Sequence, residues 1–194
     1  MRWILVGSWL ALGCGTAKVV DDESSESSPS DSGDPSSGDD ASTGEPVVGW
    51  FDIGWGDTEW HTLDEGGILK VVWGGQGAAM FPMPIRGAEF VLPDPPDDYT
   101  SELAPLLDLQ LDIEGHNDGV GGHFKRIANY PITFEIQPDG SYEYIYLAVL
   151  LPDEIDPAIL DGLPGHLEVQ LRPYGSAPLS ISRDLVIADA DPPQ

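Results

Sequence analysis

The feature that most constrains this fold is the stretch 106–113 (LLDLQLDI), in which apolar and polar residues alternate. Successive side chains of a β-strand point to opposite faces of the sheet, so this alternation indicates a strand with one buried face and one wet face. The buried face would carry Leu107, Leu109, Leu111 and Ile113, and the wet face Asp108, Gln110 and Asp112. No long stretch shows a 3.6-residue pattern, so the sequence predicts strands rather than helices.

Short apolar runs separated by turn residues recur from residue 47 to about residue 190. The runs that we expect to form strands are 47–53, 59–63, 68–73, 78–85, 88–92, 106–113, 132–137, 142–151, 167–171 and 179–187. Many short strands of this kind predict an all-β domain, an antiparallel immunoglobulin-like or fibronectin-like β-sandwich. A small up-and-down or jelly-roll barrel is the alternative.

Residues 14–46 differ sharply from this domain. They are rich in Ser, Asp, Glu, Gly and Pro and contain no aromatic residue. Low hydrophobicity combined with high charge cannot bury enough apolar surface to offset chain entropy. We therefore expect a disordered acidic linker at 14–46, a β-sandwich domain at 47–190 and a short tail at 191–194. As a flexible coil the linker would span on the order of 30 Å.

The N-terminal residues 1–13 contain a positive charge and then an apolar run that is too short to cross a bilayer but fits a signal peptide. The run leads into Ala11-Leu12-Gly13-Cys14, which resembles the lipobox of bacterial lipoproteins. The resemblance implies cleavage before Cys14 and attachment of a diacylglycerol thioether and further fatty chains, such as palmitate, to this residue. It also implies a lipid-anchored envelope protein. Gly15 stands where Asp causes inner-membrane retention, which favours the outer membrane. An ordinary secretory signal with an incidental Cys is the alternative.

The segment 54–87 resembles part of a group of uncharacterised secreted bacterial lipoproteins that also carry a Ser/Asp linker. The matching residues are Gly54, Gly56, Leu63, Gly74, Gln76 and Gly77. This resemblance implies no activity.

The net charge of −26 excludes some partners. Nucleic acids and anionic lipid headgroups are bound by clustered Lys and Arg, and this chain has 34 acidic residues against 8 basic ones. The charge itself fits solubility and self-repulsion, with cation binding as the competing interpretation.

Metal sites are the main alternative to a plain binding domain. His116, Asp118 and His123 lie in a Gly-rich loop, and imidazole and carboxylate suit zinc or copper. Their spacing matches no standard zinc pattern, and Asn-Asp-Gly is ordinary turn sequence. Calcium is the favoured cation in this alternative, because two acidic clusters lie on loops that could gather carboxylates at one end of a sandwich. They are Asp94, Asp97 and Asp98, and Asp153, Glu154 and Asp156.

Signals for catalysis are weak. The chain has no Gly-x-Ser-x-Gly sequence, and a Cys14 that carries lipid is not a nucleophile. A hydrolase using loop carboxylates is therefore the second alternative. Four tryptophans lie close together in the sequence, and core positions are the favoured interpretation, whereas exposed positions would make a carbohydrate- or protein-binding face. They are Trp50, Trp55, Trp60 and Trp73.

These observations together predict a lipid-anchored envelope protein, on the outer membrane rather than the inner, with a non-catalytic β-sandwich that binds or presents something. No cofactor is expected apart from calcium in the cation-binding alternative. The partners expected are the membrane, through the lipid on Cys14, and a protein or carbohydrate ligand, but no nucleic acid.

Overall fold

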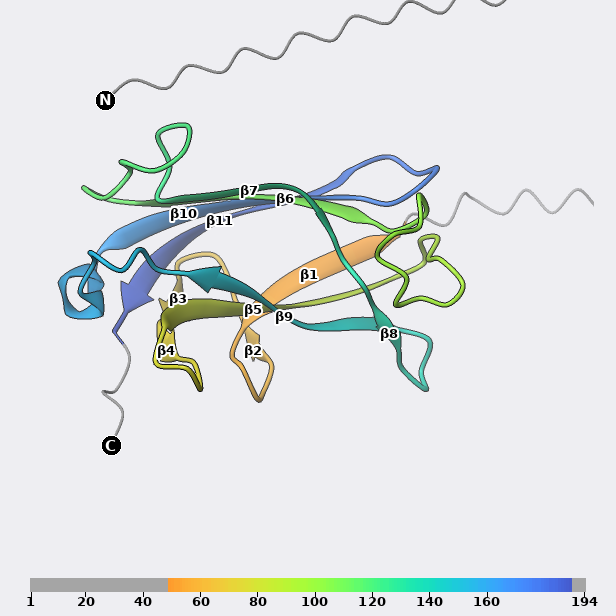
Figure 1. The fold of residues 1–194 in the computed structure, drawn as a ribbon, viewed down its shortest axis with the longest axis horizontal. Helices are drawn as coiled ribbons and strands as arrows, with labels where there is room; N and C mark the ends of the chain where they lie inside the picture. The colour runs from red at the N-terminus through yellow and green to blue at the C-terminus, as the bar shows by residue number, and fades with distance from the viewer. Residues whose placement is uncertain (1–48, 190–194) are drawn as a thin grey trace, which may run out of the picture. The chain divides into compact units, whose positions relative to one another are not determined.

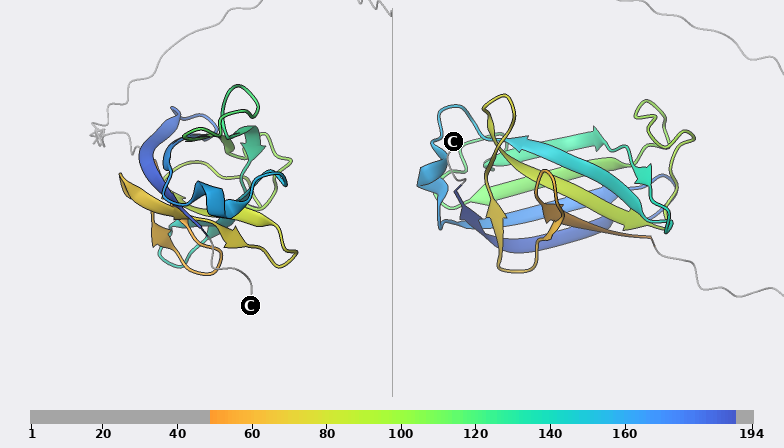
Figure 2. Two further views of the ribbon diagram at one scale, coloured as in Figure 1. Left: turned by 90° about the vertical axis from the view of Figure 1, so that its left-hand side faces the viewer. Right: turned by 90° about the horizontal axis from the view of Figure 1, so that it is seen from below.

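The computed structural model describes residues 49–189, which form two β-sheets facing each other (Figures 1 and 2). Within this range the chain forms strands β1 to β11 and one short 3-10 helix, η1 (Pro157–Leu160), so the prediction of an all-β fold is confirmed. The signal peptide 1–13, Cys14, the linker and the tail 191–194 lie outside the described residues. Within the described range there is no helix with the length and hydropathy needed to span a membrane.

One sheet has six strands and is built around β5. Its order is β2 (His61–Thr62), β1 (Trp50–Trp55), β5 (Ala79–Ala88), β9 (Tyr142–Leu150) and β8 (Glu135–Ile136), with β4 (Val72–Trp73) also paired to β5. All of these pairs are antiparallel. The predicted strand at 88–92 does not form, because β5 ends at Ala88 and the next residue, Glu89, has a φ of 65°.

The other sheet has five strands. Its order is β3 (Gly67–Lys70), β11 (Leu179–Ala188), β10 (Pro164–Arg172), β6 (Leu106–Ile113) and β7 (Lys125–Pro131). The β3–β11 pair is parallel, so the prediction of a wholly antiparallel sandwich is wrong at this edge. The reason lies at Val71, where the chain crosses from β3 in this sheet to β4 in the other, which splits the predicted strand 68–73.

The core lies between the two sheets, and β6 supplies one row of it. Leu107, Leu109, Leu111 and Ile113 are all fully buried, and the residues between them are partly exposed, as the alternation predicts. The inward side chains of β5 are buried to the same degree; they are Phe81, Met83 and Ile85. Full burial of such a side chain contributes about 1.5–3 kcal/mol, so these rows hold the sheets together.

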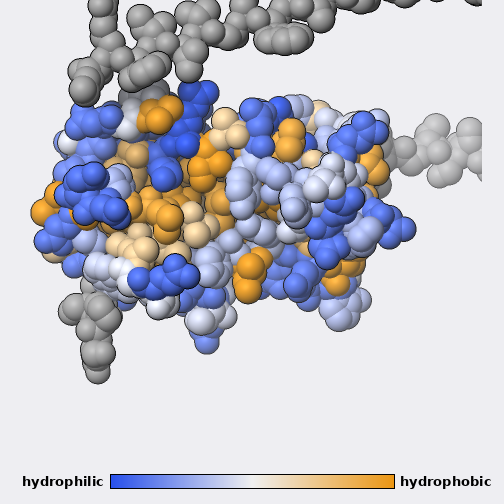
Figure 3. Space-filling model, in the orientation of Figure 1, coloured by the Kyte–Doolittle hydropathy of each residue, from blue (hydrophilic) through white to orange (hydrophobic). Residues whose placement is uncertain are grey.

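Apolar side chains reach the surface along the side where β7 and β9 face each other. Figure 3 shows this face, with apolar colour at its centre and hydrophilic colour around it. The exposed hydrophobic residues of these strands include Tyr130 on β7 and Leu150 on β9. The Lys125 ammonium donates to the Leu150 carbonyl at 3.4 Å, so the two edges are tied together at this point.

Candidate ligand-binding site on the five-stranded sheet

Three successive outward positions on each of the three central strands of the five-stranded sheet are polar. Strand register places them in three rows that run across β6, β10 and β11. The rows are Asp112, His166 and Asp184; Gln110, Glu168 and Ser182; and Asp108, Gln170 and Ser180. All nine side chains are exposed or partly exposed. Because β10 lies between the other two strands, its side chains have polar neighbours on both sides.

A β-bulge in β7 brings a fourth strand into this array. The register between β6 and β7 shifts between Leu107 and Leu109, and Asn129 adopts a φ of 54° at this point. The Asn129 N–H then donates to Asp108 Oδ1 at 2.7 Å. Bulges bend a strand and redirect its side chains, and here the result is a polar wall beside the rows.

Arg172 closes the network at the bulge. Its Nη2 donates to Asn129 Oδ1 at 2.6 Å and lies 2.9 Å from Asp108 Oδ2. Its Nε is buried and donates to no other atom in the described part of the chain. The three residues therefore hold one another in place at this end of the sheet surface.

These strands line a groove with a volume of about 660 Å³. Its polar lining includes Asp108, Gln110, Arg126, Asn129, Glu168 and Gln170. Arg172, Ser180 and Ser182 contribute as well. Ligand sites in proteins are commonly clefts of about 300–1,000 Å³ with convergent polar groups, and this groove has that size.

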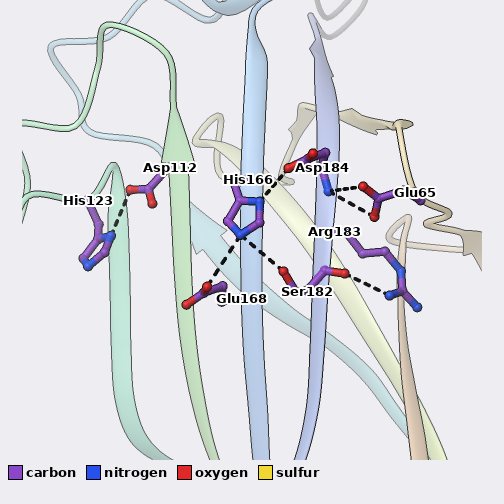
Figure 4. A network of polar contacts seen from close by, with 8 residues as sticks. All are labelled: Glu65, Asp112, His123, His166, Glu168, Ser182, Arg183 and Asp184. Atoms are coloured by element: carbon purple, nitrogen blue, oxygen red, sulfur yellow. Dashed lines mark hydrogen bonds and ion pairs between the residues drawn. The ribbon is translucent and has the colours of Figure 1, made fainter.

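His166 is the centre of a second polar network, near the end of the groove (Figure 4). Its Nδ1 lies 2.6 Å from Asp184 Oδ1, and its Nε2 lies 3.3 Å from Ser182 Oγ and 3.6 Å from Glu168 Oε1. The hydrogen bond to Asp184 raises the pKa of His166, and Glu168 acts in the same direction. The charged imidazolium is therefore favoured in the folded protein.

The order Ser182, His166, Asp184 has the connectivity of a nucleophile, a base and an orienting acid. Two features favour a binding role over nucleophile activation. Glu168 beside Nε2 favours a proton on that nitrogen, and a protonated Nε2 donates to Ser182 Oγ instead of accepting its proton. In addition, Ser182 projects from the middle of β11 and not from a sharp turn of the kind that exposes a nucleophile.

The predicted metal ligands His116, Asp118 and His123 are not brought together. His123 Nδ1 lies 2.9 Å from Asp112 Oδ1, across the strand pair, whereas Asp118 is exposed in the loop. Among residues 49–189 no group of three or more His, Cys, Asp or Glu is placed to hold a metal ion. A metal site in this loop stays a prediction from sequence.

The two acidic loop clusters lie at opposite ends of the six-stranded sheet, so their carboxylates do not meet, and a calcium site at either loop stays a prediction from sequence. The register of β5 with β9 shows the reason: Gly87 pairs with Tyr142, and Met80 pairs with Leu150. The loop 93–98 follows one end of β5, and the loop 153–156 follows the end of β9 that lies beside the other. Two of the carboxylates already accept local hydrogen bonds, Asp98 from Thr100 and Asp156 from Ala158.

The four tryptophans are not part of the buried core, which corrects the favoured interpretation. Trp50 is 46% exposed. Trp55 and Trp73 are partly buried against the core, and Trp55 stacks on His61 with ring centroids 4.2 Å apart. Trp60 lies on the outer face of the six-stranded sheet, with the Arg86 guanidinium 4.4 Å from its ring centroid. The four therefore form no single surface cluster of stacked rings.

The sequence did not predict the groove, although two of the strands that line it show a recognisable pattern. Polar residues at every second position mark the outward faces of β10 and β11; they are His166, Glu168 and Gln170 on β10, and Ser180, Ser182 and Asp184 on β11. Residues 125–131 show no such pattern, so neither β7 nor its bulge could be predicted from the sequence.

Comparisons of this chain with protein-family models, curated proteins and solved structures found no match. The geometry of the groove is therefore the basis for a functional proposal.

Proposed function

We propose that this protein is a lipid-anchored component of the cell envelope whose β-domain binds a polyhydroxylated ligand, such as a glycan, in the groove of the five-stranded sheet, without catalysis. The observation that carries the proposal is the polar array. Nine outward side chains on three paired strands alternate between carboxylate, amide, hydroxyl and imidazole groups. Each sugar hydroxyl both donates and accepts hydrogen bonds, and such an array offers both kinds of partner.

The composition of the groove favours a small polar ligand over a protein surface. The centre of a protein–protein interface is usually apolar and depleted of charged residues. Here the groove is lined by charged and amide side chains, among them Asp108, Glu168 and Gln170. The side chains stand on paired strands, so little ordering is needed when a ligand binds.

The anchoring part of the proposal rests on the sequence before residue 47. Two or more acyl chains on Cys14 would hold the protein stably on a membrane, and the acidic linker 14–46 would let the domain reach beyond the headgroups. Replacing Cys14 by Ser should move the protein from the membrane fraction to the soluble fraction. Retention of this variant in the membrane fraction would contradict lipid anchoring at Cys14.

We also propose that the two facing sheets form an immunoglobulin-like or fibronectin-like sandwich. Support comes from the two stacked sheets and from the core between them. An experimental structure in which the strands close into a single barrel would remove this assignment.

Binding is tested with the full chain in detergent and a panel of neutral hexasaccharides, namely cello-, malto-, manno- and chitohexaose. We expect measurable heat in calorimetry with at least one member, and at least about a tenfold loss of affinity in the double variant Gln110→Ala/Gln170→Ala, since two amide contacts are lost. Gln76→Ala is the matched control, because Gln76 is exposed in a turn outside the groove. No binding to any hexasaccharide, or equal losses in the control, would count against the proposal.

A further inference from the structure

Basic residues are scarce in this chain, and the structure places most of those in the described part on one sheet. Among residues 49–189 only Arg86 belongs to the six-stranded sheet. The others lie on strands of the five-stranded sheet and are Lys70, Lys125, Arg126, Arg172 and Arg183. Of these, Arg126 and Arg172 line the groove, where they balance Asp108 and Glu168. In a chain with a net charge of −26, the groove therefore repels an anionic group less than the rest of the surface does.

Arg126 is the cation available at the groove. It stands on β7 opposite Gln110 of β6 and lines the groove. No ion pair or hydrogen bond occupies its guanidinium among the described residues. By contrast, the Arg86 guanidinium on the other sheet is taken up by Glu143 at 2.8 Å and by the Trp60 ring.

Arg172 supplies a second guanidinium in the same groove. Asp108 and Asn129 occupy its Nη2, whereas its buried Nε donates to no acceptor in residues 49–189. Because this Nε is buried, a ligand cannot reach it, and Arg172 contributes positive charge to the groove rather than a free donor. Arg126 thus presents free donors to the groove, and Arg172 adds positive charge from the strand on the other side of β6.

We infer that the groove contains an anion subsite at Arg126, with Arg172 adding positive charge, so that the preferred ligand is an acidic glycan rather than a neutral one. This inference rests on the proposed binding function of the groove and deepens it. A guanidinium offers two parallel N–H donors that match the oxygens of a carboxylate, a sulfate or a phosphate. Glu168 and Asp108 on the groove lining restrict where such a group sits, because they repel it from the centre of the rows towards β7.

The test compares an oligogalacturonate with its methyl ester, which has the same sugars without the negative charge, and with dextran sulfate. With the full chain in detergent, we expect the acid form to bind at least about tenfold more tightly than the ester, and the preference to weaken as salt is raised. The comparison between oligogalacturonate and dextran sulfate tells a carboxylate preference from a sulfate preference.

Substitutions test whether Arg126 forms the anion subsite. Arg126→Gln should weaken binding of the acid form at least about tenfold more than binding of the ester, and Arg126→Lys should keep part of the preference. Arg183→Gln is the matched control, since Arg183 does not line the groove. Equal binding of acid and ester, or an unchanged preference in Arg126→Gln, would remove the anion subsite but leave the glycan-binding proposal standing. Binding of neither form, together with no effect of Gln110→Ala/Gln170→Ala on any neutral hexasaccharide, would remove both.

Discussion

The outer faces of the two sheets have opposite characters. On the five-stranded sheet nine outward positions of β6, β10 and β11 are polar, and six of them line a groove. On the six-stranded sheet the outward positions of β5 include Met80, Pro82 and Pro84, which are buried. Trp60 and Arg86 lie over the same face. The part of this face over β1 and β5 is thus covered by its own chain, whereas the central strands of the other sheet line an open groove.

The coverage of the six-stranded sheet has a local cause. A Cβ added at Gly54 of β1 would lie only 3.1 Å from atoms of the Trp60 indole, so the absence of a side chain lets this ring approach the strand. Arg86 then packs over the ring and reaches Glu143 on β9. The comparison teaches that tryptophans near the surface do not mark the largest open groove described in this domain.

Substitutions on the inner and outer sides of β6 should differ most in their effect on the free energy of unfolding. Leu109→Ala should lower the free energy of unfolding by about 2–5 kcal/mol, because it leaves a cavity in a fully buried site. Gln110→Ala, one residue further along on the outer side, should change it by no more than about 0.5 kcal/mol. Urea denaturation followed by fluorescence measures both. Similar losses in the two variants would mean that the assigned faces of β6 are wrong.

The second largest effect on the free energy of unfolding should come from removing the Trp60 ring, which covers part of the outer face of the six-stranded sheet. Trp60→Ala should cost about 1–3 kcal/mol, which is less than for a fully buried tryptophan because Trp60 is partly exposed. Glycan binding should stay the same, since the groove is on the other sheet. Trp50→Ala is the control for a more exposed ring. Loss of glycan binding in Trp60→Ala, with the fold intact by circular dichroism, would move the binding site to this face.

The bulge in β7 should tolerate only some residues at position 129. Asn129→Val should cost about 1–2 kcal/mol, because a β-branched side chain is strained at a φ of 54°. Asn129→Gly relieves the strain but removes the acceptor of Arg172, so it should weaken binding while changing stability less. Thermal unfolding and calorimetry of the two variants separate these effects. Equal stability of the Val and Gly variants would contradict the left-handed backbone at this residue.

The smallest expected effect is a pH dependence from His166. Its pKa is raised by Asp184, so its contribution to stability is complete below the unfolded value of about 6.5 and is lost as the pH rises through the folded pKa. Since the side chain is 40% exposed, we expect a difference of less than about 1 kcal/mol between the two ends of this range. Urea midpoints between about pH 5.5 and pH 8.5 should fall more steeply in the wild type than in His166→Gln, with His116→Gln as control. Parallel curves for the wild type and His166→Gln would contradict the predicted contribution.

Local pattern explains which elements were predictable. The alternation in 106–113 is β6, and the runs at 142–151 and 179–187 match β9 and β11 to within a residue or two. β7 was missed because its residues, Lys125–Pro131, do not alternate: it is an edge strand with a bulge, and its partner β6 decides where it pairs.

The candidate site divides in the same way. The polar faces of β6, β10 and β11 can be read from their two-residue period, but the rows of the groove cannot, because Gln110, Glu168 and Ser182 come from strands far apart in the sequence. The predicted metal ligands in the loop are not brought together. His123 contacts Asp112 of β6 instead of His116 of its own loop, and this contact depends on how β6 and β7 lie together.

The sequence by itself determined the all-β class, the buried and wet faces of its regular strands, and the break in composition before residue 47. Side-chain alternation and turn chemistry act over a few residues, so they are visible in the chain alone. Only the tertiary structure decided the parallel edge at β3, the crossing at Val71, the separation of the acidic loops and the meeting of Arg126 and Arg172 in one groove. Each of these depends on the register between distant strands, which is selected by burial of the whole core and not by any local preference.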